Sequence, residues 1–170
     1  MDNIKISTSL NIKDYRSLLF QLTYKKPLII ILTIIGFLSL ITSILYFFGL
    51  FSSFSNPPYF PLFFGIFIAF FLPLSVYRQA NRSFNGNKRL SESITYEFSQ
   101  DHVSLTGESF TSTYTWNKIP KIVINQKWVL IYQNKTTANI IMRKNFQESD
   151  LLQFINIINS YNSIKKKIKK

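Results

Sequence analysis

Residues 25–78 read KKPLIIILTIIGFLSLITSILYFFGLFSSFSNPPYFPLFFGIFIAFFLPLSVYR, and their only charged side chains are two lysines at the start and one arginine at the end. A helix of about 24 residues extends about 36 Å, whereas the hydrocarbon core of a bilayer is about 30 Å thick. The first uncharged run, from Pro27 to about Phe51, has no polar side, unlike a surface helix of a soluble domain. It therefore predicts a membrane-spanning helix at residues 28–50.

A second uncharged run follows at residues 58–77, and roughly 18–20 residues suffice for one crossing. The segment SSFSNPP between the runs is too short for anything but a tight turn, so the two helices should form an antiparallel hairpin. Pro73 should kink the second helix because proline has no N–H to donate. Small residues four apart allow helices to approach closely in lipid, and two such pairs are Ser39 with Ser43 and Gly65 with Ala69.

The positive charge flanks this uncharged segment. The net charge of the chain is +12. Residues 1–26 carry five basic and two acidic side chains, residues 27–77 carry none, and residues 78–170 carry fifteen basic and six acidic ones. Because Lys and Arg near the membrane mark the cytoplasmic side, both termini should be cytoplasmic and the loop at residues 51–56 should lie outside.

The composition excludes several kinds of site. The chain has no cysteine and one histidine, which excludes disulfides, thiolate metal sites and multi-histidine metal sites. No phosphate-binding loop or nucleophile elbow is present, and no ionisable side chain lies within the apolar runs, where it would suggest transport. We expect neither a cofactor nor enzymatic activity.

The region after residue 91 alternates apolar and polar side chains with a period of two. Stretches such as SITYEFS at 93–99 and WVLIYQN at 128–134 make about six short strands, which is typical of an antiparallel sheet or a partly open barrel. From residue 151 the apolar period becomes helical, so a terminal amphipathic helix should pack on the sheet.

The N-terminal segment shows a strand pattern followed by a helix pattern. Ile4, Ile6, Thr8 and Leu10 alternate as in a strand, and Asn11 precedes IKDYRSLLFQL with Asp14 three residues on, as at a capped helix start. Because a sheet with free edges gains from another strand, residues 3–10 should pair with a strand of the 92–142 region.

These patterns divide the chain into four parts. They are an N-terminal strand and helix at 1–26, a transmembrane hairpin at 27–77, a basic linker at 78–91, and a cytoplasmic domain with a basic tail at 92–170. The fold class is a membrane α-helical hairpin plus an α+β domain of about six to seven strands and a C-terminal helix.

The order of these segments resembles the YcxB-like family of small bacterial membrane proteins. The similarity is carried by ITYEFSQDHVSL at 94–105, YTWNKI at 114–119, VLIY at 129–132 and IIMRKNF at 140–146. It implies a multi-pass protein of the bacterial cytoplasmic membrane. The strand-then-helix order is similar to pleckstrin-homology-like (PH-like) folds, which is an analogy of fold and not of function.

Candidate site residues are few. His102 has the position of a turn residue, and Trp116 and Trp128 are typical core residues. The basic side chains expected to contact an anionic lipid headgroup or a partner are Arg143, Lys144, Lys165, Lys166, Lys167, Lys169 and Lys170. In the tail, Ile164 and Ile168 would share one face of a helix and could enter the membrane interface.

Two function classes remain. The first is a membrane-tethered, non-enzymatic module that binds a protein or an anionic lipid through its cytoplasmic domain. The second is a membrane accessory or immunity protein that acts on a partner through its hairpin. Nucleic-acid binding is not expected, because the topology accounts for part of the positive charge and no recognition motif is present.

Overall fold

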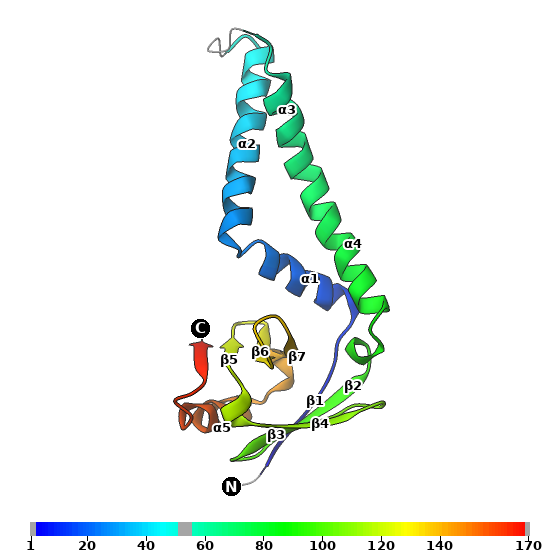
Figure 1. Ribbon diagram of the computed structural model, residues 1–170, viewed down its shortest axis with the longest axis vertical. Coiled ribbons are helices and arrows are strands. Elements are labelled where there is room, and N and C mark those ends of the chain that lie inside the picture. The colour runs from blue at the N-terminus through cyan, green and yellow to red at the C-terminus, as the bar shows by residue number, and fades with distance from the viewer. Residues whose placement is uncertain (1–2, 51–55, 169–170) are drawn as a thin grey trace. The chain divides into compact units, whose positions relative to one another are not determined.

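The computed structural model describes residues 3–50 and 56–168 (Figure 1). The chain divides into two compact units, one of residues Asn11–Asn87 and one of Met1–Leu10 with Lys88–Lys170. The predicted segment 1–26 therefore contributes its strand to one unit and its helix to the other. Most of the predicted outer loop at 51–56, and Phe51 with it, lies outside the described residues.

The first long helix, α2, spans Pro27–Phe47 and begins with a proline whose missing N–H costs nothing there. Its end is a Schellman motif around Gly49, which has a φ of 72°. The Gly49 N–H donates to the Tyr46 carbonyl at 2.9 Å, and the Leu50 N–H donates to the Leu45 carbonyl at 2.9 Å. The helix therefore ends three residues before the predicted boundary.

The second apolar segment is one continuous helical run of three parts, α3 (Tyr59–Ile66), the π-helix η1 (Phe67–Phe71) and α4 (Leu72–Asn85). In an α-helix the ring of Pro73 would clash with the carbonyl four residues earlier, that of Ala69. The π-helix includes Ala69, so its wider turn lies where this clash would occur, and the kink at Pro73 stays a prediction. The helix continues beyond the apolar residues to Asn85.

The antiparallel helices α2 and α3 pack against each other (Figure 1), and two glycines leave no room for a side chain in this contact. A Cβ atom added to Gly65 would lie 2.7 Å from the Leu40 Cβ and 2.8 Å from the Gly36 carbonyl oxygen, and one added to Gly36 would lie 2.8 Å from the Ile68 Cβ. Ser43 is fully buried, and its hydroxyl donates to the Pro58 carbonyl just before α3 at 3.3 Å. Gly65 and Ser43 thus have their predicted packing role, whereas Ala69 is exposed. Gly36 also lies in the contact, but it was not predicted because it belongs to neither of the two pairs.

Replacing Gly65 by valine should separate the two helices. No side chain fits against the Leu40 Cβ, and overpacking of a close contact costs about 1–3 kcal/mol. We expect a lower midpoint for the thermal loss of helical circular dichroism in detergent. Ala69→Val, one turn away on the exposed side, is the matched control, and equal midpoints for the two variants would contradict this packing.

The amphipathic helix α1 (Ile12–Thr23) packs against α4. The Asn11 side chain accepts a hydrogen bond from the Asp14 N–H at 2.8 Å, which confirms the predicted cap. The Arg16 side chain donates to Asn81 at 2.6 Å, and its guanidinium lies 4.2 Å from the centre of the Tyr77 ring. These contacts join the start of the chain's helical unit to its last helix.

The other unit contains two four-stranded sheets. Sheet A has the order β1-β2-β3-β4, all antiparallel, with β1 at Ile4–Ser9, β2 at Ser93–Phe98, β3 at His102–Thr106 and β4 at Thr111–Thr115. Strand β1 pairs with β2 from Ile4 opposite Phe98 to Ser9 opposite Ser93. The predicted pairing of the N-terminal strand is confirmed.

Sheet B has the order β7-β6-β5-β8, with β5 at Lys121–Ile124, β6 at Trp128–Tyr132, β7 at Ala138–Met142 and β8 at Lys165–Ile168. Strand β8 runs parallel to β5 and the other pairs are antiparallel. Over residues 3–50 and 56–168 the strands form two four-stranded sheets and no closed barrel. The predicted α+β arrangement with antiparallel strands is confirmed, with the parallel strand β8 as an addition.

The prediction for the basic tail is wrong, because Lys165–Ile168 is a strand and not a helix. Ile164, immediately before it, is only 4% exposed and belongs to the core. It is therefore not available to enter a membrane interface. Burial of this one side chain holds the start of the tail beside the free edge of β5, and backbone pairing continues from there.

Short 3₁₀ turns connect several of these elements, η2 (Lys88–Leu90), η3 (Trp116–Lys118) and η4 (Arg143–Asn145). Helix α5 (Glu148–Asn159) is the predicted amphipathic helix, and its apolar face closes the core. The Phe154 ring lies 4.8 Å from that of Phe98 and 6.2 Å from that of Trp116, centre to centre. An aromatic cluster therefore connects sheet A to α5.

Candidate functional site

Sheet B carries only positive charge. No Asp or Glu occurs between Ser109 and Gln147, nor after Asp150. The described basic residues of its strands, their connecting turns and the adjoining 3₁₀ turns are Lys118, Lys121, Lys127, Lys135, Arg143, Lys144, Lys165, Lys166 and Lys167. We call this set the basic sheet. Its charge comes from residues on several strands, so it is a property of the fold as well as of the tail.

The turn between β5 and β6 positions Arg143. Buried Asn125 accepts hydrogen bonds through its side chain from the N–H groups of Lys127 (3.0 Å) and Trp128 (2.8 Å), as asparagine does in turns. The Arg143 side chain then donates to the Asn125 carbonyl at 3.4 Å, and its N–H donates to the Lys127 carbonyl at 3.0 Å. Arg143 thereby lies beside Lys127.

The tail lysines line the opposite edge of the sheet. Lys165, Lys166 and Lys167 pair in register with Lys121, Ile122 and Val123 of β5. The Lys121 ammonium lies 4.8 Å from the centre of the Tyr132 ring, a cation–π contact that keeps it on the sheet surface. Successive side chains of a strand alternate between its two faces, so Lys165 and Lys167 place their ammonium groups on one face of this edge strand, where they can attract phosphate or carboxylate groups.

The structure brings together only some of the predicted site residues. Lys165, Lys166 and Lys167 share one strand, whereas Arg143 and Lys144 follow β7 at the other edge. Lys169 and Lys170 lie outside the described residues. Lys121 and Lys127 were not predicted, because a single lysine in a short strand carries no signal until its neighbours on the sheet are known.

The acidic side chains with described contacts lie on or near sheet A. Lys5 and Glu97 form an ion pair at 3.6 Å on this sheet. Glu92 accepts hydrogen bonds from the Ser109 hydroxyl (2.6 Å) and the Ser109 N–H (3.0 Å), and these bonds lower the pKa of the Glu92 carboxyl. The acidic side chains of the two sheets and their turns therefore belong to sheet A, whereas sheet B has basic side chains and no acidic ones.

The other residues singled out from the sequence are hydrogen-bonded or buried, and they are His102, Trp116 and Trp128. His102 is half-buried at the start of β3, with its Nδ1 3.0 Å from the Ser99 hydroxyl across the β2–β3 turn. The Trp116 indole N–H donates to the Ser99 carbonyl at 3.1 Å. Trp116 and Trp128 are both fully buried, which confirms them as core residues.

The family model described as YcxB-like protein matches residues 98–158. These residues are a YcxB-like domain. The match runs from the end of β2 to near the end of α5, and so includes the aromatic cluster and strands β5, β6 and β7. It confirms the resemblance that the sequence predicted over this part of the chain. The searches of curated proteins and of solved structures found no match.

The YcxB-like domain in this chain is completed by segments outside the matched residues. Strand β1 covers the free edge of β2, and β8 covers the free edge of β5. The matched segment contains Arg143 and Lys144, whereas the three described tail lysines lie beyond it. The positive charge of the basic sheet thus combines residues of the domain with residues of its C-terminal extension.

Proposed function

We propose that the protein is a membrane-anchored, non-enzymatic binding module. Its helical hairpin spans the membrane, and the basic sheet of the YcxB-like unit binds anionic lipid headgroups. The observation that carries the proposal is the charge of sheet B, whose strands and turns hold basic side chains and no acidic ones. The order of strands followed by a C-terminal helix supports the analogy with PH-like folds as part of this proposal.

The surface of the two long helices supports the membrane anchor. Both are long and apolar enough to cross a bilayer, and only 11% and 17% of their apolar windows are buried. A core helix of a soluble protein would be mostly covered. In water, exposed side chains such as Phe60 (80%) and Phe70 (72%) would be costly, whereas lipid solvates them.

The positions of the flanking charges support an orientation with both termini in the cytoplasm of a bacterial cell. The charges lie at the ends of the hairpin that join the rest of the chain. Since the chain has no native cysteine, single introduced cysteines report this directly. An impermeant maleimide added to cells should label Asn56→Cys and not Thr136→Cys, and the reverse pattern would contradict the orientation.

Headgroup binding would add only moderate affinity. Each basic residue near an anionic leaflet contributes about 1 kcal/mol, so the three lysines of β8 contribute at most about 3 kcal/mol. This suffices because the hairpin raises the local concentration of the domain at the membrane. The attraction should weaken as salt shortens the Debye length from about 10 Å at 0.1 M to about 3 Å at 1 M.

Spin labels on the full chain in bilayers test the proposal. A label at Ile168→Cys, 45% exposed at the end of β8, should be less mobile with phosphatidylglycerol than with phosphatidylcholine alone, and 1 M salt should release it. A control label at Thr111→Cys, exposed on sheet A and away from the basic sheet in the strand order, should not respond. Equal mobility of the Ile168 label in both bilayers would refute headgroup binding and leave a protein ligand, or an action through the hairpin, to account for the module.

A further inference from the structure

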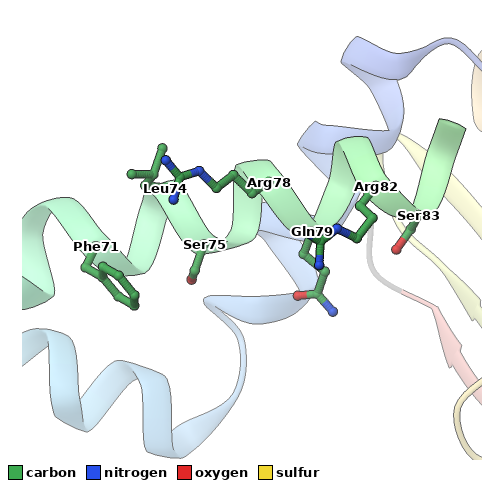
Figure 2. Close-up of a pocket in the computed structure, with 7 residues that line it drawn as sticks. All are labelled: Phe71, Leu74, Ser75, Arg78, Gln79, Arg82 and Ser83. Atoms are coloured by element: carbon green, nitrogen blue, oxygen red, sulfur yellow. The ribbon is translucent and has the colours of Figure 1, made fainter. Parts of the chain in front are cut away.

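One face of the α3–α4 run carries a cavity of about 330 Å³. The residues that line it come from the end of η1 and from α4 and are Phe71, Leu74, Ser75, Arg78, Gln79, Arg82 and Ser83. Figure 2 shows that all of these side chains project from a single helix, with the apolar ones at one end and the arginines toward the other. The cavity is therefore amphipathic along the helix axis.

The axial position of the two arginines matches the surface of a membrane. Residues 59–76 are uncharged, and 18 helical residues extend about 27 Å, close to the thickness of the hydrocarbon core. Tyr77 and then Arg78 follow this length, and Arg82 is one turn further. If the hairpin spans the membrane as proposed, the guanidinium groups lie at the depth of the lipid phosphates and Phe71 lies among the acyl chains.

Among the described residues of the helical unit, neither guanidinium group forms an ion pair. Both side chains are exposed, and Asp14 is the only acidic residue of the sequence between residues 11 and 87. Like charges four residues apart on a helix repel each other and destabilise it. An anion placed between them would reverse this, and arginine binds phosphate through two parallel N–H···O bonds.

We propose that this face of α4 is a binding site for one anionic phospholipid. The phosphate lies between Arg78 and Arg82, the exposed Gln79 amide donates to the headgroup, and an acyl chain follows the helix past Leu74 and Phe71. This site rests on the proposed membrane anchor but not on the basic sheet, because its residues belong to the other unit of the chain.

Native mass spectrometry of the detergent-solubilised full chain tests this site. The wild type should bind one phosphatidylglycerol at least about tenfold more tightly than phosphatidylcholine, because the quaternary ammonium of choline offsets the phosphate charge and is repelled by the two arginines. Arg78→Gln with Arg82→Gln should abolish the preference, and Arg78→Lys with Arg82→Lys should reduce it, since lysine keeps the charge and loses the two-point contact.

A variant that removes two positive charges elsewhere distinguishes a specific site on α4 from general electrostatic attraction between the protein and the lipid. Lys13→Gln with Lys26→Gln also removes two exposed positive charges from the helical unit, and it should keep the preference. An equal loss in both double variants, or no preference in the wild type, would overturn the site. Glycerol phosphate, added as a competitor, should displace no lipid, and displacement would identify a site for free phosphates instead.

The same experiment separates this inference from the proposed function. Lys165→Gln, Lys166→Gln and Lys167→Gln together remove the described charge of β8 and should leave the single tightly bound lipid in place. Loss of that lipid in the triple variant would assign it to the basic sheet and overturn the site on α4. If the triple variant retains the lipid and the spin label at Ile168 does not respond, headgroup binding by the basic sheet is refuted, whereas the site on α4 is not.

Discussion

Deletion of residues 1–10 is expected to unfold the unit that contains the YcxB-like domain. Strand β1 pairs with β2 over six residues, and Ile4 (4% exposed) and Ile6 (2% exposed) enter the core from it. With Leu10, three apolar side chains are lost, each worth about 1.5–3 kcal/mol of burial. The sum of about 5–9 kcal/mol is comparable to the whole stability of a small domain.

Tryptophan emission measures this loss directly. The chain has two tryptophans, and both are fully buried in this unit, so their emission should shift to the red when it unfolds. The deletion leaves Asn11, the cap of α1, in place, so the helical signal of the other unit should persist.

Single substitutions in β1 provide a graded control. Ile6→Ala should cost about 2–5 kcal/mol because it leaves a cavity in the core. Lys5→Ala, on the outer face of the same strand, removes an exposed ion pair and should cost at most about 1 kcal/mol. Unshifted tryptophan emission after the deletion would show that β1 is dispensable.

Replacement of Phe98 by alanine should have the largest effect of any single substitution. Phe98 is fully buried, and its ring lies 4.8–6.2 Å, centre to centre, from the rings of four other aromatic residues. Truncation of a buried phenylalanine costs about 3–5 kcal/mol, and aromatic pairs add about 0.5–1.5 kcal/mol each.

Urea unfolding followed by tryptophan emission gives the free energy of unfolding of this variant. Phe110→Ala is the comparison, because Phe110 is only partly buried against the same core and its loss should cost clearly less. A similar loss for both variants would mean that the cluster around Phe98 is not the centre of the fold.

Much of this fold could be predicted because its signals are local. Ile4 and Ile6 in β1 alternate with polar residues, and so do Tyr96 and Phe98 in β2. This period of two is typical of a strand with one buried face. The absence of charge from Pro27 to Tyr77 similarly predicts two apolar helices. The capping role of Asn11 follows from residues within one turn.

The candidate site was harder to predict from the sequence than the fold was. Arg143 and the tail lysines were identified by their charge, but their neighbours Lys121 and Lys127 were not. Asn125, which holds Arg143 in position, has only the weak signal of an asparagine in a turn. The arginines of α4 lie in the segment predicted as a basic linker that begins with a helical extension, and nothing in the sequence indicates the cavity on one face of that helix.

The amino-acid sequence by itself determined the apolar hairpin, the strands β1–β7 and the amphipathic helix α5, because each follows from the spacing of neighbouring side chains. The tertiary structure decided the division into two sheets, the contact of Gly36 with α3, and the strand conformation of the lysine-rich tail. A run of lysines is compatible with a helix end or a strand, and local interactions do not choose between them. Burial of Ile164 in the core brings the tail to the open edge of β5, and the backbone hydrogen bonds available only there make it a strand.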